Sequence, residues 1–284
     1  MARWAFVASV LLIEFLGGAG CTSSEENKSG SGEVGGGGGA ASGGGGETAG
    51  GAGGAAAAGG GVAMAPDMLV VLDRSGSMND AVDGTSCTGG CGEASKWNLL
   101  KTELGAALAP EETNVRWALK LFASSNLCAV TDGVEVAPQF SSAATIAAQL
   151  GLVSATTSTP TTAAVSAAAA YLAALADGAP KYIVLVTDGA PTCGSSPCAP
   201  GPGETGNQCD DDNAIAAVKQ AYTALGIPTF VLGIGVSGPA EATLTQMALA
   251  GGEPRAGPGP LYYPVASAAD LSAAFSAIAA VAAP

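Results

Sequence analysis

One short stretch decides the fold of this chain, and it reads MLVVLDRSGSM at residues 68–78. Five consecutive apolar residues, 68–72, are typical of a parallel strand with both faces buried, because no polar side chain alternates with the apolar ones. This predicted strand ends at Asp73, and Ser75 and Ser77 follow it. The stretch therefore predicts a buried strand with one carboxylate and two hydroxyls at its end.

Outward from this stretch, short apolar runs alternate with Ala-rich helical patterns. Strands are predicted at residues 115–123, 134–140, 181–186, 228–234 and 261–265. Helices are predicted at residues 96–108, 142–150, 162–176, 239–250 and 268–280, with another that starts at Asn213. This alternation predicts an α/β fold, in which a doubly wound, mostly parallel sheet carries helices on both faces. The strand at 134–140 pairs as a hairpin and supplies one antiparallel edge strand.

A second carboxylate, Asp188, follows the predicted strand at 181–186 in the stretch VTDG, residues 186–189. Between the two acids lies a hydroxyl-rich loop, TTSTPTT at residues 156–162, which contains Thr159. Taken singly, each loop is typical of an ordinary turn or helix cap. If the first and fourth strands are neighbours, the loops meet at one sheet edge, where parallel sheets bind ligands. Their oxygen atoms suit Mg²⁺, with Mn²⁺ or Ca²⁺ as alternatives.

Taken together, the three loops resemble the metal-ion-dependent adhesion site of the von Willebrand factor A family. Asp73, Ser75 and Ser77 match its D-x-S-x-S loop. Thr159 matches the threonine that precedes a proline, and Asp188 matches the aspartate of the third loop. The resemblance begins at about residue 67 and continues to the C-terminus. It implies a Rossmann-like fold, in which the serines and often the threonine contact the metal while the aspartates commonly act through water.

The same resemblance implies that the domain binds a protein ligand, whose acidic residue completes the shell of the metal ion. Composition is consistent with a binding module. The net charge is −14, and the ten Lys and Arg residues are scattered singly, which argues against nucleic acid as a partner. The chain contains no His, the commonest general base. We therefore expect an adhesion module rather than an enzyme, and leave its oligomeric state open.

Other interpretations of the same residues remain. The domain could be a scaffold or assembly subunit for one dedicated partner, as A-type domains are in metal-chelatase complexes. A phosphatase-like enzyme is a weaker alternative, because the haloacid dehalogenase family, which the first loop superficially resembles, requires an aspartate where this chain has Ser75. The stretch GIGVSG at 233–238 matches a dinucleotide-binding pattern, but it lacks a well-placed acidic residue for the ribose.

The N-terminal region predicts export. Residues 1–20 contain an apolar run at 4–13 and small residues directly before Cys21. This run is shorter than the about 20 residues that span a bilayer, and it is typical of a signal peptide. A cysteine at this place resembles the bacterial lipoprotein signal, which implies lipidation of Cys21, although cleavage with release or an uncleaved anchor remain alternatives. Residues 21–65 are Gly-, Ala- and Ser-rich and predict a disordered tether. The folded domain then spans 66–284, at the outer membrane or cell surface, with the lipid anchor as its only membrane contact.

Six further cysteines are expected to form disulfides, because exported domains are oxidised. They are Cys87, Cys91, Cys128, Cys193, Cys198 and Cys209. Three of them lie in the loop after the strand at 181–186, so complete pairing requires at least one bridge to another loop. Zinc is an alternative ligand for these cysteines, but the spacings without His match zinc sites poorly. The acidic run at 210–212 is expected to cap the helix that starts at Asn213.

Overall fold

The computed structural model describes residues 64–124, 128–155, 158–193 and 206–282, with the backbone alone at 206–209. The predicted signal peptide, Cys21, nearly all of the predicted tether and Cys198 lie outside these residues. None of the helices in the described ranges combines the length and apolarity needed to cross a membrane.

The strands of the described residues form one six-stranded sheet in the order β3-β2-β1-β4-β5-β6. Their bounds are β1 Asp67–Asp73, β2 Arg116–Phe122, β3 Val136–Gln139, β4 Lys181–Thr187, β5 Thr229–Ile234 and β6 Tyr263–Val265. Every neighbouring pair is parallel except β2 and β3, which are antiparallel. The predicted architecture, mostly parallel with one antiparallel edge strand, is confirmed.

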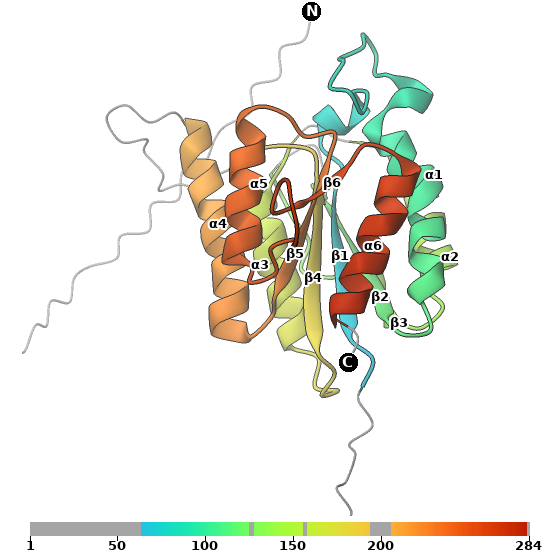
Figure 1. The fold of residues 1–284 in the computed structure, drawn as a ribbon, viewed down its shortest axis with the longest axis vertical. Helices are drawn as coiled ribbons and strands as arrows, with labels where there is room; N and C mark the ends of the chain where they lie inside the picture. The colour runs from blue at the N-terminus through green and yellow to red at the C-terminus, as the bar shows by residue number, and fades with distance from the viewer. Residues whose placement is uncertain (1–63, 125–127, 156–157, 194–205, 283–284) are drawn as a thin grey trace, which may run out of the picture. The chain divides into compact units, whose positions relative to one another are not determined.

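Helices cover both faces of this sheet (Figure 1). One face packs against α1 (Lys96–Leu108), α2 (Ala143–Gly151) and α6 (Ala268–Ala282), and the other against α3 (Thr161–Ala173), α4 (Gly206–Leu225) and α5 (Pro239–Ala250). Strand β1 serves both layers, because successive side chains of a strand point to opposite faces. Its residues 68, 70 and 72 join the first core, and 69 and 71 join the second. This double burial explains its unbroken apolar sequence.

The predicted start of α4 is wrong. The helix begins at Gly206 rather than at Asn213, so the acidic run at 210–212 lies inside it and does not cap it. From residue 210 on, where side-chain burial is described, the first buried position of the helix is Ala214, because residues 210–213 are polar. One acid of the run bridges two helices, since Thr243 Oγ1 of α5 donates a 3.0 Å hydrogen bond to Asp211. Smaller differences at the ends of α3, β3 and β6 do not change the layers.

Candidate metal centre

The site lies where β1 and β4 end. These strands are parallel neighbours, with Leu72 paired to Val186, so Asp73 and the residues after β4 reach the same sheet edge. Thr187 Oγ1 donates a 2.6 Å hydrogen bond to Asp73 Oδ2 and joins the two strand ends directly. The condition on which the sequence prediction depended, that the first and fourth strands are neighbours, is therefore met.

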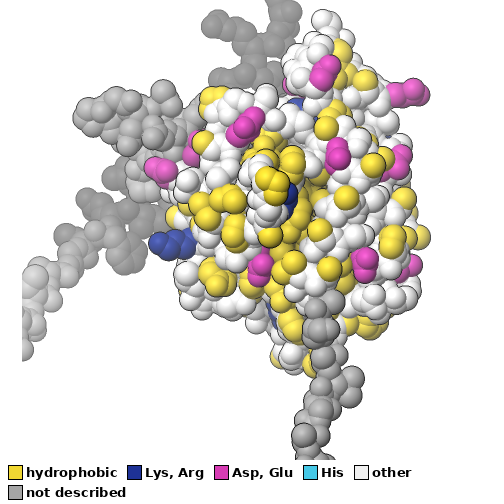
Figure 2. Space-filling model, in the orientation of Figure 1, with side chains coloured by type: hydrophobic (Ala, Val, Ile, Leu, Met, Phe, Trp, Pro, Cys, Tyr) yellow, Lys and Arg dark blue, Asp and Glu magenta, His cyan; other side chains and the backbone are white. Residues whose placement is uncertain are grey.

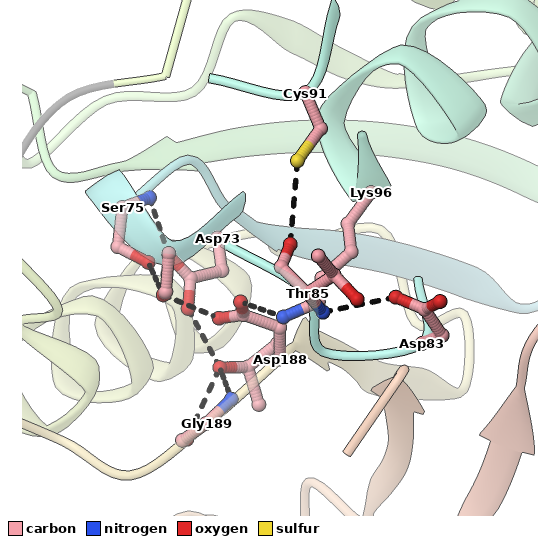
Figure 3. Close-up of polar contacts among 10 residues, drawn as sticks. Asp73, Ser75, Asp83, Thr85, Cys91, Lys96, Asp188 and Gly189 are labelled. Carbon is pink, nitrogen blue, oxygen red and sulfur yellow. Dashed lines mark hydrogen bonds and ion pairs between the residues drawn. The ribbon is translucent and has the colours of Figure 1, made fainter. Parts of the chain in front are cut away.

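Four of the five predicted site residues form a chain of hydrogen bonds (Figure 3). The backbone N–H of Ser75 donates to Asp73 Oδ1 at 2.7 Å, and the hydroxyls of Ser75 and Ser77 lie 3.0 Å apart. Ser77 Oγ then donates to Asp188 Oδ1 at 2.9 Å. Asp73, Ser75 and Asp188 are buried, whereas Ser77 is exposed. Two carboxylates and two hydroxyls are thus gathered at one edge, with access from solvent at Ser77.

The electrostatics of these residues favour a cation. Burial, together with the nearby charge of Asp188, raises the pKa of the Asp73 carboxyl to about 7. Hydrogen bonds from Thr187 and Ser75 act in the opposite direction but do not offset burial. A group of four or more hard oxygen donors with two adjacent carboxylates fits Mg²⁺ or a similar ion. The described residues contain no cluster of three or more His, Cys, Asp or Glu side chains that could hold a metal, so such an ion would depend on the serine hydroxyls.

Thr159, the fifth predicted residue, is held beside the others through its backbone. It lies just before α3 and is buried. Its N–H donates to Thr192 Oγ1 at 3.1 Å, and its carbonyl accepts from the Thr192 N–H at 3.2 Å. The loop that contains Thr159 is therefore joined to the loop after β4, on which Asp188 lies. Its hydroxyl takes part in none of the hydrogen bonds that link the other four residues.

Sequence reasoning missed Lys96. Its ammonium Nζ lies 2.8 Å from Asp188 Oδ2, and the two side chains are only 6% and 1% exposed. The prediction placed Lys96 at the start of an amphipathic helix and gave it no other role. One signal was available, because the first position of a helix favours negative rather than positive charge. A lysine there indicates an interaction outside the helix.

The described residues contain two disulfides, and one of them joins two loops, as predicted. Among the described residues, Cys87 pairs with Cys91 within the β1–α1 loop, and Cys128 pairs with Cys193. The second bridge links the loop after β2 to the loop after β4, which confirms the expected connection between loops. Cys198 and the side chain of Cys209 lie outside the described residues.

A surface hollow and two glycines lie outside the set of predicted site residues. Hydrophobic side chains gather between α5 and α6 on the face seen in Figure 2, where a hollow is lined by Arg255, Tyr263, Asp270 and alanines of α6. None of the five predicted site residues lines this hollow. The glycines at 233 and 235 are explained by packing, because a Cβ on Gly235 would lie 2.2 Å from the carbonyl oxygen of Val82 and one on Gly233 would lie 2.7 Å from Tyr262.

Known proteins resemble this chain in structure but not in sequence. No protein-family model matches the sequence, and no curated protein matches it. Among solved structures, the PilB minor pilin from Streptococcus sanguinis is 17% identical with a TM-score of 0.56, over 77% of this chain and 61% of that one. The pilus adhesin SpaC from Lactobacillus rhamnosus GG is 18% identical with a TM-score of 0.53, over 76% of this chain and 30% of that one.

The vWF domain of the type V pili tip protein Mfa5 from Porphyromonas gingivalis is 13% identical with a TM-score of 0.52. That match covers 78% of this chain and 95% of the Mfa5 domain, whereas this chain spans less than two thirds of the SpaC and PilB chains. All three matches have TM-scores above 0.5 and cover about three quarters of this chain, so they share its fold. The chain therefore has the α/β fold of a von Willebrand factor A domain.

Proposed function

We propose that this domain is an adhesion module that captures a protein ligand through a divalent cation. The observation that carries the proposal is the hydrogen-bonded chain of Asp73, Ser75, Ser77 and Asp188 at the ends of two adjacent parallel strands. In this proposal Thr159 completes the set of ligands. Mg²⁺ suits these donors, with Mn²⁺ or Ca²⁺ as alternatives.

The chain's own residues determine what such a site attracts. Two carboxylates neutralise the formal charge of a divalent ion, but one of them, Asp188, also faces Lys96. The serine hydroxyls are neutral donors, so the bound cation would supply an electrophilic position for an acidic group. Ser77 is exposed, and a ligand can therefore reach this position from solvent. An Asp or Glu side chain of a protein partner is the group that we expect to bind.

The proposal places the module on the outside of the cell. Residues 1–20 are the signal peptide, Cys21 is the lipidated residue, and residues 21–65 are the tether in this interpretation. Strand β1 runs from Asp67 to Asp73, so the preceding segment joins the sheet at the edge opposite the site. A domain attached in this way presents Asp73 on the side away from its attachment. The pilus proteins of similar fold are consistent with a role at a surface.

Metal binding is tested first. The purified domain is titrated with Mg²⁺ in a calorimeter, with Ser75→Ala/Ser77→Ala as the test variant and Ser86→Ala, an exposed serine of the β1–α1 loop, as the matched control. We expect wild type and the control to bind Mg²⁺ alike and the double variant to lose binding. Unchanged binding in the double variant would contradict the proposed site.

Ligand capture is tested next, with the immobilised domain and an extract of the cell envelope. We expect retention of a protein in Mg²⁺, its release by chelator, and no retention on the Ser75→Ala/Ser77→Ala variant. Retention that survives both treatments would place recognition elsewhere on the domain. Retention of one stoichiometric partner complex, rather than a surface ligand, would favour the assembly-subunit alternative.

A further inference from the structure

The third-loop aspartate has no free oxygen in this structure. Asp188 Oδ1 accepts a hydrogen bond from Ser77, and Asp188 Oδ2 lies 2.8 Å from the ammonium of Lys96. Figure 3 shows the Lys96 side chain reaching from α1 toward Asp188. The ammonium of Lys96 thus lies next to Asp188, one of the two carboxylates that would bind the metal. The ion pair is shielded from solvent, because neither side chain is more than 6% exposed.

The backbone and its neighbours fix Lys96 in this place. Ser95 caps α1 by accepting a 3.1 Å hydrogen bond from the Asn98 N–H, so Lys96 is the first residue of the helix. The Lys96 N–H donates to the Asp80 carbonyl at 2.9 Å. The stem of the side chain passes Gly235, where a Cβ would lie 3.2 Å from Lys96 Cε. A cation at a helix N-terminus is disfavoured by the helix dipole, and the charge of Asp188 offsets that cost.

We propose that Lys96 is a built-in counter-cation of Asp188 that lowers the affinity of the site for divalent metal. The inference rests on the proposed function, since it concerns the same site. Metal ligation requires both aspartates in the deprotonated form, in which they carry two negative charges, and the lysine cancels one of them. A metal ion therefore meets a site of net charge −1 rather than −2, in a buried setting where a unit charge acts strongly. Metal binding also requires that the ion share Asp188 with the ammonium or displace it.

This arrangement has a consequence for the metal-free protein. When both buried carboxylates are deprotonated they repel each other, and the charge of Lys96 compensates part of that repulsion. Lys96 therefore stabilises the loops of Asp73 and Asp188 in the metal-free protein. It also lowers the fraction of sites that hold a metal ion at low metal concentration. Removing its charge should tighten metal binding and, at the same time, make the fold depend more on metal.

The test uses Lys96→Met, which keeps an apolar stem and removes the charge, and Lys101→Met, which removes an exposed lysine from the same helix. Binding of Mn²⁺ alone is measured by loss of the free-ion electron paramagnetic resonance signal. We expect Lys96→Met to bind Mn²⁺ more tightly by roughly tenfold or more, because a buried charge is lost. Lys101→Met should change the affinity by less than about twofold, because an exposed charge is screened.

Thermal unfolding with and without Mn²⁺ gives the second measurement. We expect a larger metal-induced rise in Tm for Lys96→Met than for wild type, even if the variant folds only when metal is present. Equal or weaker Mn²⁺ binding by folded Lys96→Met, with binding by wild type intact, would overturn this inference and leave the proposed function standing. Absence of binding in both proteins would overturn both. Binding by the variant alone would support the inference in its strongest form.

Discussion

At the scale of single residues, the ion pair between Lys96 and Asp188 changes how a mutation at the third loop must be interpreted. Asp188→Ala leaves a buried ammonium without its partner, and breaking such a pair costs roughly 3 kcal/mol of unfolding free energy. Loss of binding in that variant would therefore mix a missing ligand with a damaged fold. The serine substitutions avoid this problem, because they remove only neutral hydroxyls.

A double-mutant cycle measured by urea unfolding in chelator separates these effects. We expect Asp188→Ala to destabilise the metal-free domain strongly, and Lys96→Met added to it to restore much of the loss, because the unpaired charge disappears. If the loss of unfolding free energy in the double variant equals the sum of the losses in the two single variants, the two side chains do not interact in solution.

At the scale of elements, hydrogen bonds and a disulfide hold the loops around the site. Thr192 joins the loop of Thr159 to the loop after β4, and the neighbouring Cys193 joins that loop to Cys128 after β2. Lys120, which is fully buried in β2, donates to the carbonyls of Thr131 and Gly133 and orders the loop after its own strand. The loops that support the site therefore follow β2, β4 and α2.

The two disulfides should differ in what they contribute to stability. Cys128–Cys193 spans a separation of 65 residues and Cys87–Cys91 a separation of 4. Loop-closure entropy in the unfolded chain then gives about 4 kcal/mol for the first and about 2 kcal/mol for the second. We expect Cys128→Ser/Cys193→Ser to lower the unfolding free energy more than the matched Cys87→Ser/Cys91→Ser variant does, as chemical denaturation measures. The reverse order would contradict the entropic argument.

At the scale of the whole domain, the sheet separates the start of β1 from the candidate metal centre. Strand β1 has seven residues, about 23 Å at roughly 3.3 Å each. Asp67, at its start, is fully buried and forms ion pairs with Arg116 at 2.7 Å and Lys181 at 3.2 Å. Burial raises the pKa of the Asp67 carboxyl, and the two cations act against that change. This cluster fixes the edge of the sheet where the preceding segment joins.

The separation predicts that stability and metal binding can be changed independently. We expect Asp67→Asn to lower the unfolding free energy by roughly 2–4 kcal/mol, because two partly buried cations lose their shared carboxylate. Mg²⁺ affinity at a temperature where the variant is folded should equal that of wild type, as calorimetry measures. Asp177→Asn, at the exposed end of the same cluster, is the matched control and should cost under about 1 kcal/mol. A change in Mg²⁺ affinity in Asp67→Asn would show coupling across the sheet.

Much of the fold was determined by local sequence. The apolar run at 68–72 predicts β1 because both faces of that strand are buried, and the helical pattern at 96–108 predicts α1 with the bounds that the structure has. The polar residues at the strand ends also predict a site, since parallel strands deliver their carboxyl ends to one edge. These signals are local, because burial repeats with the period of the strand or helix itself.

Tertiary structure alone decided which distant groups meet. The contact between Lys96 and Asp188 joins residues 92 positions apart, and the bridge between Cys128 and Cys193 joins residues 65 positions apart. The hydrogen bonds between Thr159 and Thr192 depend in the same way on two loops arriving side by side. A periodic pattern records whether a side chain is buried but not which partner it has there. That partner is set by the order of the strands and by the packing of α1 against the sheet, which place a lysine beside an aspartate that no local pattern connects to it.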